Sequence, residues 1–258
     1  MFRPHKYLVL TLASLLMAAL AVGQTAREER LVFGLQLKPI VPSELFQTGP
    51  ETFIDGNNTY VNKQRPGYAF GMFMRKSFTK RVALETGINY VVRRWRTSID
   101  LPDESFQDSI DFRIIGYEIP LQGLLFVRLG ERIYMNNAFG FSFNMFPSNV
   151  ASGDQLWGQI SARNSWLQLG LLANHGYEFR TENSGTFYLG GTIHRPFSDM
   201  YRMRVTYASD SSYEENISRL NGTYVTVDFR YAFHEPAKRK GSLKRKKEKT
   251  PLRDYLPW

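Results

Sequence analysis

The chain contains no cysteine among its 258 residues. This absence excludes a small disulfide-stapled fold, catalysis by a thiol and metal sites with cysteine ligands. Convincing helical periodicity longer than about two turns is also missing after the first 23 residues. The rest of the sequence therefore has to be read for strands.

The body of the chain carries almost no net charge, although the net charge of the whole chain is +9. Residues 234–258 hold nine Lys or Arg against three acidic residues, and the first 23 residues hold two more basic side chains. Residues 24–233 are therefore close to neutral. The basic character belongs to the two ends, so it is no sign that the body binds nucleic acid.

Three segments differ in composition. Residues 1–23 predict a secretory signal peptide, because Arg3 and Lys6 precede an uncharged run and small residues follow it. Residues 24–233 are long enough for one large domain. Residues 234–258 are rich in charge and poor in apolar side chains, which predicts a disordered basic tail.

The segment Tyr224–Phe233 alternates strictly between an apolar and a polar face, as a strand does. Its apolar face ends in the aromatic residues Phe229, Tyr231 and Phe233. This ending looks like the closing-strand signal of bacterial outer-membrane barrels. The barrel-assembly machinery is therefore one expected partner, through this strand.

Seven further segments alternate in the same way, which predicts eight antiparallel strands. The predicted strands cover 31–39, 67–78, 82–95, 112–128, 133–145, 165–179, 187–194 and 224–233. Long loops at 40–65, 97–111, about 147–164 and 197–221 alternate with short turns at 79–81, 130–131 and 181–184. This asymmetry is typical of an all-β, eight-stranded, up-and-down transmembrane β-barrel with both termini on the periplasmic side. Within it, Pro120 predicts a bulge.

The two faces of the strands favour a membrane location in the bacterial outer membrane. One face carries large apolar side chains, and the other carries glycine, alanine and a few charges of both signs. We expect the charges to pair inside the barrel, because unpaired burial costs several kcal/mol. The predicted lumen network is Lys38, Arg75, Glu85, Arg93, Glu118, Glu178, Asp228 and Arg230. A soluble, lipocalin-like periplasmic carrier is the alternative, with the apolar face turned inward.

Three segments carry a resemblance. They are Gly67–Arg75, Val82–Tyr90 and Tyr117–Gly123, the last containing Tyr-Glu-Ile-Pro-Leu. Together they resemble the PorT-type "porin family" of outer-membrane β-barrel proteins of Bacteroidetes over roughly 31–233. The resemblance implies the fold and an envelope role, in some members associated with secretion, but no defined chemistry. The tail after Phe233 departs from the family.

Catalysis is the second functional alternative, as a barrel enzyme that modifies lipid A. His194 is followed by Ser198 and Asp199, and a relay would need these side chains within about 3 Å. Arg195-Pro196 interrupts the strand between them. We therefore expect no catalytic residues, and a structural or partner-binding protein surrounded by outer-membrane lipid and lipopolysaccharide.

Two other charged stretches, the acidic stretch Asp100–Asp111 and the basic tail, give no indication of a cofactor. The acidic stretch Asp100–Asp111 lacks the spaced ligands and central glycine of a calcium loop, so we expect no metal there. The composition of the tail predicts a solvated extension, with contact to a periplasmic partner or anionic lipid as the alternative. The residues that would make that contact are Lys238, Arg239, Lys240, Lys244, Arg245, Lys246, Lys247 and Trp258.

Overall fold

Strands make up most of the part of the chain that the structure describes. The computed structural model describes residues 30–43, 50–182, 184–208 and 213–233. The predicted signal peptide and the predicted tail, with its eight contact residues, lie outside these ranges. No helix in the described part of the chain is long and apolar enough to span a membrane.

Thirteen strands and one 3-10 turn follow one another along the described residues. The strands are β1 Arg30–Val41, β2 Glu51–Asp55, β3 Asn58–Ser77, β4 Val82–Leu101, β5 Phe106–Arg128, β6 Ile133–Met145, β7 Val150–Gly153, β8 Trp157–Arg163, β9 Leu167–Arg180, β10 Thr186–Pro196, β11 Tyr201–Ala208, β12 Tyr213–Leu220 and β13 Tyr224–Ala232. The 3-10 turn is Pro102–Glu104, between β4 and β5.

Eight of these strands close into an antiparallel ring. Hydrogen-bonded neighbours run in the order β1, β13, β10, β9, β6, β5, β4 and β3, and β3 pairs back with β1. Each predicted segment lies within one of these strands, except for one or two residues at an end of 67–78, 165–179 and 224–233. The all-β class and the antiparallel eight-strand ring are therefore confirmed. A closed ring leaves none of its own edges unpaired within the wall.

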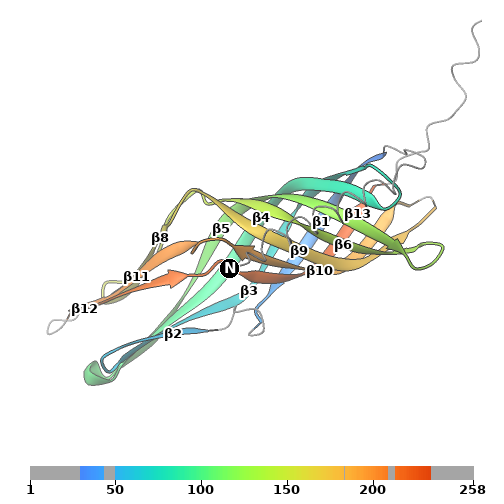
Figure 1. Ribbon diagram of the computed structural model, residues 1–258. Coiled ribbons are helices and arrows are strands. Elements are labelled where there is room, and N and C mark those ends of the chain that lie inside the picture. The colour runs from blue at the N-terminus through green and yellow to red at the C-terminus, as the bar shows by residue number, and fades with distance from the viewer. Residues whose placement is uncertain (1–29, 44–49, 183, 209–212, 234–258) are drawn as a thin grey trace, which may run out of the picture.

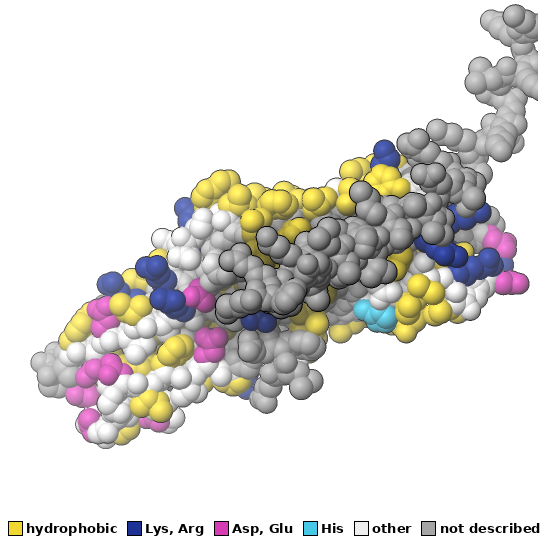
Figure 2. Space-filling view, in the orientation of Figure 1, with side chains coloured by type: hydrophobic (Ala, Val, Ile, Leu, Met, Phe, Trp, Pro, Cys, Tyr) yellow, Lys and Arg dark blue, Asp and Glu magenta, His cyan; other side chains and the backbone are white. Residues whose placement is uncertain are grey.

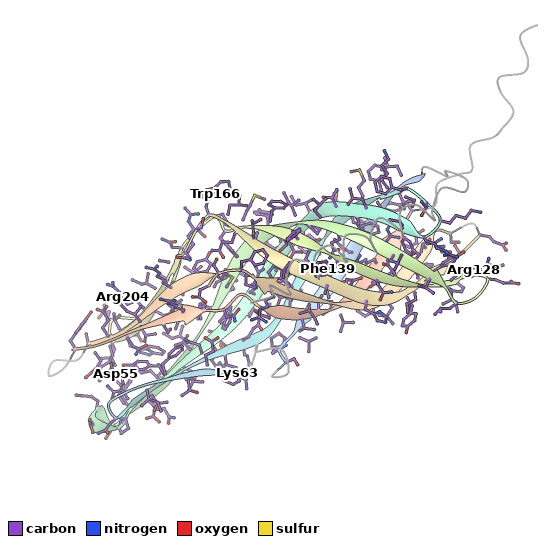
Figure 3. The ribbon with its side chains drawn as sticks, viewed as in Figure 1. Asp55, Lys63, Arg128, Phe139, Trp166 and Arg204 are labelled. Atoms are coloured by element: carbon purple, nitrogen blue, oxygen red, sulfur yellow. The ribbon has the colours of Figure 1, made fainter. Side chains whose placement is uncertain are left out.

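The two ends of the ring differ (Figure 1). Three tight turns, at Thr79–Arg81, Gly130–Arg132 and Thr181–Gly185, lie at one end together with the last residue of β13. We call this the turn end. At the other end β3, β4 and β5 run on past the ring and meet β2, β7, β8, β11 and β12. We call this part the cap. In Figure 3, Arg128 marks the turn end and Asp55 and Arg204 mark the cap.

The prediction that this end of the ring carries four long loops is wrong. Residues 51–55 and 58–66 are strand, the acidic stretch lies on the ends of β4 and β5, and the other two loops form the β7–β8 and β11–β12 hairpins. Strands β12, β11, β8 and β7 make a second antiparallel sheet. The sequence did not predict these four strands, because the faces that they bury against the other sheet mix apolar with polar residues and so do not alternate clearly.

The cap has its own apolar core, between this second sheet and the extended ends of β3, β4 and β5. Its fully buried members are Tyr60, Ile99, Leu101, Ile114, Met200, Tyr201, Met203, Val205 and Leu220, with Trp95, Phe112, Phe146, Trp157 and Tyr207 around them. Polar bonds also join the two sheets: Trp157 donates to Asp108 at 2.8 Å, and Asn62 donates to Ser218 at 3.1 Å. The cap is thus a small sandwich built onto the ring.

Proline shapes the wall at a different place from the one expected. The bulge predicted at Pro120 is wrong, because the register between β5 and β6 runs through Pro120–Ser142 without a shift. The register shift lies instead between Arg65 and Tyr68, on β3 against β4, where Pro66 and Gly67 stand. A bulge there rotates the cap half of β3 by one residue relative to the barrel half.

Small residues make room for large ones inside the ring. The ring of Tyr188 lies over two glycines on neighbouring strands, Gly176 and Gly190. A Cβ at Gly190 would stand 2.2 Å from the Tyr188 hydroxyl oxygen and 2.5 Å from the backbone oxygen of His175. The glycines on the inward face are therefore needed for packing as well as for the strand's curvature.

We expect Ile99→Ala to loosen the cap selectively. Ile99 is 0% exposed, so its truncation should cost about 2–5 kcal/mol. Amide hydrogen exchange in β8 and β11 should accelerate while exchange in β1 and β13 stays unchanged. Ile217→Ala, at a side chain 62% exposed on β12, is the matched control and should change neither. Equal acceleration in both variants would contradict a packed cap.

Candidate functional site

The interior of the ring is a balanced set of charges. All eight residues of the predicted lumen network are buried: four cations, Lys38, Arg75, Arg93 and Arg230, and four anions, Glu85, Glu118, Glu178 and Asp228. They come from β1, β3, β4, β5, β9 and β13. Alternation along each strand places them there, because their neighbours in sequence face outward.

Seven of the eight belong to two charge clusters. In the larger cluster, Arg75 bonds Glu85 at 2.8 Å and Glu178 at 2.5 Å. Arg230 bonds the other oxygen of Glu85 at 2.7 Å and Asp228 at 2.9 Å. Lys38 lies 3.8 Å from Asp228. This chain of contacts crosses the lumen from β3 and β4 to β9, β13 and β1.

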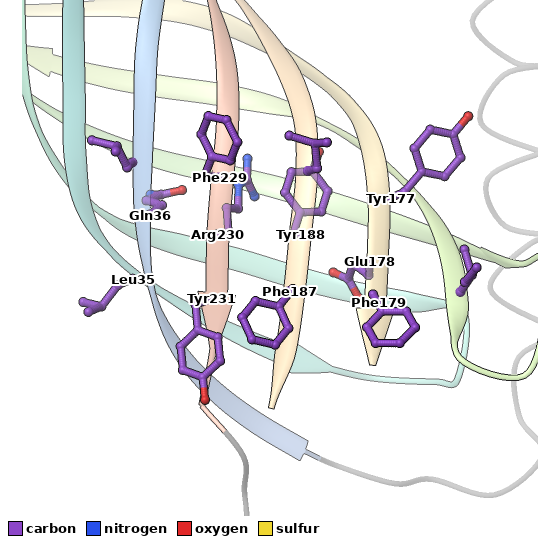
Figure 4. A pocket seen from close by; sticks show the side chains of 13 residues that line it. Leu35, Gln36, Tyr177, Glu178, Phe179, Phe187, Tyr188, Phe229, Arg230 and Tyr231 are labelled. Carbon is purple, nitrogen blue, oxygen red and sulfur yellow. The ribbon is translucent and has the colours of Figure 1, made fainter. Parts of the chain in front are cut away.

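Neutral side chains complete the bonding of these carboxylates. Asp228 accepts from Thr192 and Thr226 at 2.5 Å each and from Asn174 at 2.9 Å. Glu178 accepts from Asn136 at 3.0 Å. Sequence reasoning found the charges but missed these partners, whose only signal was their position on the polar face. Figure 4 shows Gln36, Arg230, Tyr188 and Glu178 on four neighbouring strands, β1, β13, β10 and β9.

The smaller cluster lies nearer the cap and centres on Glu118. Its carboxylate accepts hydrogen bonds from the Tyr224 hydroxyl and from Asn89 at 3.0 Å. His194 stands 3.8 Å away and its ring stacks on Tyr224 with centroids 4.5 Å apart. Within the described residues, Glu118 is thus the one charged residue among the lumen carboxylates that has a histidine, and no Lys or Arg, within 4.0 Å.

Arg93 differs from the other lumen cations. Among the described residues no carboxylate lies within ion-pair distance of its guanidinium, and its Nε and Nη2 have no hydrogen-bond partner. The guanidinium lies over the rings of Tyr224 and Phe146, 4.8 and 5.5 Å from their centroids. Cation–π attraction, worth up to about 2 kcal/mol when desolvated, partly offsets the cost of burying this charge. Arg93 therefore lies where the cap core begins, next to its member Phe146.

His194 has other partners than the relay residues considered from sequence. Its Nε2 lies 2.9 Å from the Ser142 hydroxyl and 3.1 Å from Asn144. Ser198 is exposed, and Asp199 pairs with Arg219 at 3.4 Å. Ser142 and Glu118 both approach the same ring nitrogen, whereas a relay needs the acid on one nitrogen and the nucleophile on the other. The hollow beside His194 is too small to admit a water molecule, so a substrate cannot reach this pair.

The acidic stretch forms no metal site within the described residues, where no group of three His, Asp or Glu side chains converges. Its Asp111 instead accepts two hydrogen bonds from Arg96, both at 2.7 Å. These bonds hold the pKa of Asp111 below its usual range, against a small opposing effect of desolvation. Asp108 bonds Trp157 across the cap. The stretch therefore has a structural use.

The closing-strand residues lie on the outer wall. Phe229 and Phe233 are exposed, and Tyr231 is half-buried. The rings of Phe187 and Tyr231 stand 5.1 Å apart, and those of Tyr231 and Phe233 stand 5.5 Å apart. These aromatic side chains and the lumen charges therefore occupy opposite sides of the same strand, β13.

A closed antiparallel ring with a charged interior and an apolar outer wall is the class of fold that these observations define. No protein-family model matches the chain, and no curated protein is similar to it at a significant level.

Three solved structures are similar in shape. The outer membrane protein OprG from Pseudomonas aeruginosa is 8% identical, with 81% of this chain and 98% of that chain covered and a TM-score of 0.47. The translocator domain of autotransporter NalP from Neisseria meningitidis is 10% identical, with coverages of 87% and 95% and a TM-score of 0.27. The beta domain of the Bordetella autotransporter BrkA is 8% identical, with coverages of 80% and 99% and a TM-score of 0.22. Likenesses this weak establish neither a family nor a function.

We expect Arg230→Met to destabilise the ring strongly. The substitution leaves Glu85 and Asp228 with one cation partner fewer in a buried site, which should cost about 3–5 kcal/mol. The urea midpoint of unfolding in detergent measures this loss. Arg132→Met removes the exposed pair with Glu182 and should cost no more than about 1 kcal/mol. If both variants unfold at the same midpoint, the buried network does not hold the ring.

Proposed function

We propose that this chain is an outer-membrane β-barrel protein with a filled polar lumen, which acts without enzymatic activity as a structural or partner-binding protein. One observation carries the proposal: the ring turns its large apolar side chains outward and its charges inward. Phe141, Leu169 and Phe229 are 48%, 45% and 49% exposed, while Glu85, Arg93 and Asp228 are almost fully buried. A soluble barrel requires the reverse arrangement.

The outer wall is apolar around the whole ring. Its exposed side chains include Leu35 and Leu37 on β1, Met72 on β3, Ile88 on β4, Leu121 on β5, Phe139 on β6, Leu169 on β9, Leu189 on β10 and Val227 on β13. On the face drawn in Figure 2, hydrophobic side chains lie over the ring, and charged side chains lie toward both ends of the molecule. A continuous apolar surface of this size on a monomer needs a lipid or protein cover.

Aromatic side chains gather at both rims of the apolar wall. Near the cap, Phe70, Tyr90 and Tyr117 follow one another across three strands, with centroids 5.3 and 5.8 Å apart. Near the turn end lie Phe187, Tyr231 and Phe233. Two such girdles are the signature of the two membrane interfaces of a barrel. The shortest strand of the ring, β13, has 9 residues, which is about the length that a tilted crossing needs.

Two polar side chains on the outer wall satisfy each other. His175 and Asn137, on neighbouring strands, are joined by a 2.7 Å hydrogen bond between Nδ1 and Oδ1. In hydrocarbon an unpaired polar group would cost several kcal/mol, so this pairing is what a lipid-facing position requires.

The lumen supports the non-enzymatic part of the proposal. Side chains fill an eight-stranded barrel, and here they are locked in ion pairs beneath a capped end. Neither a wide diffusion path nor an accessible base is supported by this arrangement. The proposal has four more specific parts. The chain is a PorT-type protein of Bacteroidetes, and its termini and the turn end lie in the periplasm. It is assembled through Phe229, Tyr231 and Phe233, and it contacts a partner through the basic tail.

We expect Phe139→Arg to weaken the folded barrel while Ile217→Arg leaves it unchanged. The two side chains are equally exposed, at 61% and 62%, but Phe139 lies mid-wall and Ile217 lies on the cap. Arginine at the bilayer midplane costs about 2–4 kcal/mol, whereas on a wet surface it costs almost nothing. Unfolding of the protein in lipid bilayers by urea measures the difference. Equal tolerance of both substitutions would mean that the wall faces water.

Enzymatic activity on lipid A has its own test. Deleting the gene should leave the mass spectrum of cellular lipid A unchanged. A lost or added acyl chain that reverts with the wild-type protein, and not with His194→Ala, would replace the proposed role by the enzymatic one.

A further inference from the structure

Three arginines stand side by side on the outer face where the cap meets the ring. Arg65 on β3 is the register partner of Arg94 on β4, and Arg94 is the partner of Arg113 on β5. All three side chains point outward; Arg94 and Arg113 are exposed and Arg65 is half-buried. We call these three residues the arginine row.

The bulge in β3 creates this row. In the barrel half of β3, Tyr68 pairs with Val92, and an unbroken register would place Pro66 opposite Arg94. The shift between Arg65 and Tyr68 brings Arg65 to that position instead and turns its side chain outward. The local irregularity therefore completes a cation set that a regular strand would have broken.

The arginine row has no ion-pair partner within the described residues, although Arg65 is close enough to Asp111 for its charge to help Arg96 lower the pKa of that carboxyl. Like charges directly opposite one another on a sheet are destabilising. Within the described residues, no carboxylate lies within 4.0 Å of these three guanidinium groups. The nearest acidic side chain in the hollow they line is Asp111, and Arg96 in the next row already binds both of its oxygens. The same hollow, of about 580 Å³, is open toward the outside.

The height of the row above the apolar wall is defined by the register. The next outward row toward the ring is Tyr68, Val92 and Ile115, and below it comes the aromatic row of Phe70, Tyr90 and Tyr117. Lys63, in the row on the other side, lies near the junction of ring and cap in Figure 3. In a membrane-inserted barrel this places the three guanidinium groups at the level of lipid headgroups.

We propose that the arginine row binds the phosphate groups of a phosphorylated glycolipid in the outer leaflet. This rests on the proposed function, since it needs the apolar wall to lie in the membrane and the cap to lie outside. Arginine binds phosphate through two parallel N–H donors. Three neighbouring strands span about 10 Å, which is wide enough for more than one phosphate of a single headgroup. A disaccharide phosphorylated at both ends fits such a row better than a phospholipid with one phosphate.

Binding of purified lipid A to the full-length protein in detergent tests the proposal. Native mass spectrometry would compare wild type with the triple variant Arg65→Gln, Arg94→Gln and Arg113→Gln. We expect the triple variant to bind lipid A at least tenfold more weakly. The matched control, Lys80→Gln, Arg81→Gln and Arg128→Gln, removes the same charge at the turn end and should bind within twofold of wild type.

Two further arms separate the sources of phosphate. Phosphatidylglycerol and inorganic phosphate, each titrated against the wild type, should bind at least tenfold more weakly than lipid A. Equal lipid A binding by the triple variant, an equal loss in the control, or equal affinity of the wild type for either comparison probe would overturn the proposal.

The folding state is measured on the same samples. Each variant should keep the fast-migrating folded band in SDS until it is boiled, as expected of a membrane barrel. A wild-type protein that shows no such band and needs no detergent would refute the membrane assignment itself. A folded triple variant with undiminished lipid A binding would refute only the site.

Discussion

Two arginines, each shared between two carboxylates, connect opposite sides of the ring. Arg75 reaches from β3 to Glu85 on β4 and Glu178 on β9, and Arg230 on β13 reaches the same Glu85. Each charge is buried, so none can leave its partner without an energetic cost of several kcal/mol. The interior can therefore be polar and still fully packed, which frees the outer wall to be apolar. The outward display of leucine and phenylalanine depends on this neutral, interlocked lumen.

The same three strands serve two different interiors. In the ring, β3, β4 and β5 present Arg75, Glu85 and Glu118 inward, whereas in the cap they present Tyr60, Ile99 and Ile114 inward. The cap is surrounded by water in the proposed orientation, so its core follows the usual rule of a soluble sandwich. Arg93 lies at the change from one interior to the other, with its guanidinium over aromatic rings. The bulge at Pro66 and Gly67 allows β3 to change its facing at the same level.

The outer surface changes character at this level too. The aromatic row of Phe70, Tyr90 and Tyr117 ends the apolar wall, and the arginine row follows two outward rows further on. The aromatic row, the bulge, Arg93 and the arginine row thus lie close together at the junction of ring and cap. The proposed ligand site lies at this junction.

Much of the ring could be predicted because alternation is a local property. The facing of Phe229 and Arg230 follows from adjacent positions in one strand, and eight repeats of that pattern with short turns between them limit the topology. The same pattern assigned Lys38, Glu85 and Asp228 to the polar face. It could not say which cation meets which anion, since most of those partners lie on different strands, as Arg230 and Glu85 do, 145 residues apart in sequence.

The sequence by itself determined the class of fold, the strands of the ring and the side of the wall on which each charge lies, because these follow from neighbours along the chain. Only the tertiary structure decided that the four supposed loops build a cap, that His194 bonds Ser142 rather than Ser198, and that Arg65, Arg94 and Arg113 form a row. Those features depend on register between strands and on packing of one sheet against another. A one-residue shift at Pro66, which the alternation of a single strand does not predict, is enough to bring Arg65 into that row.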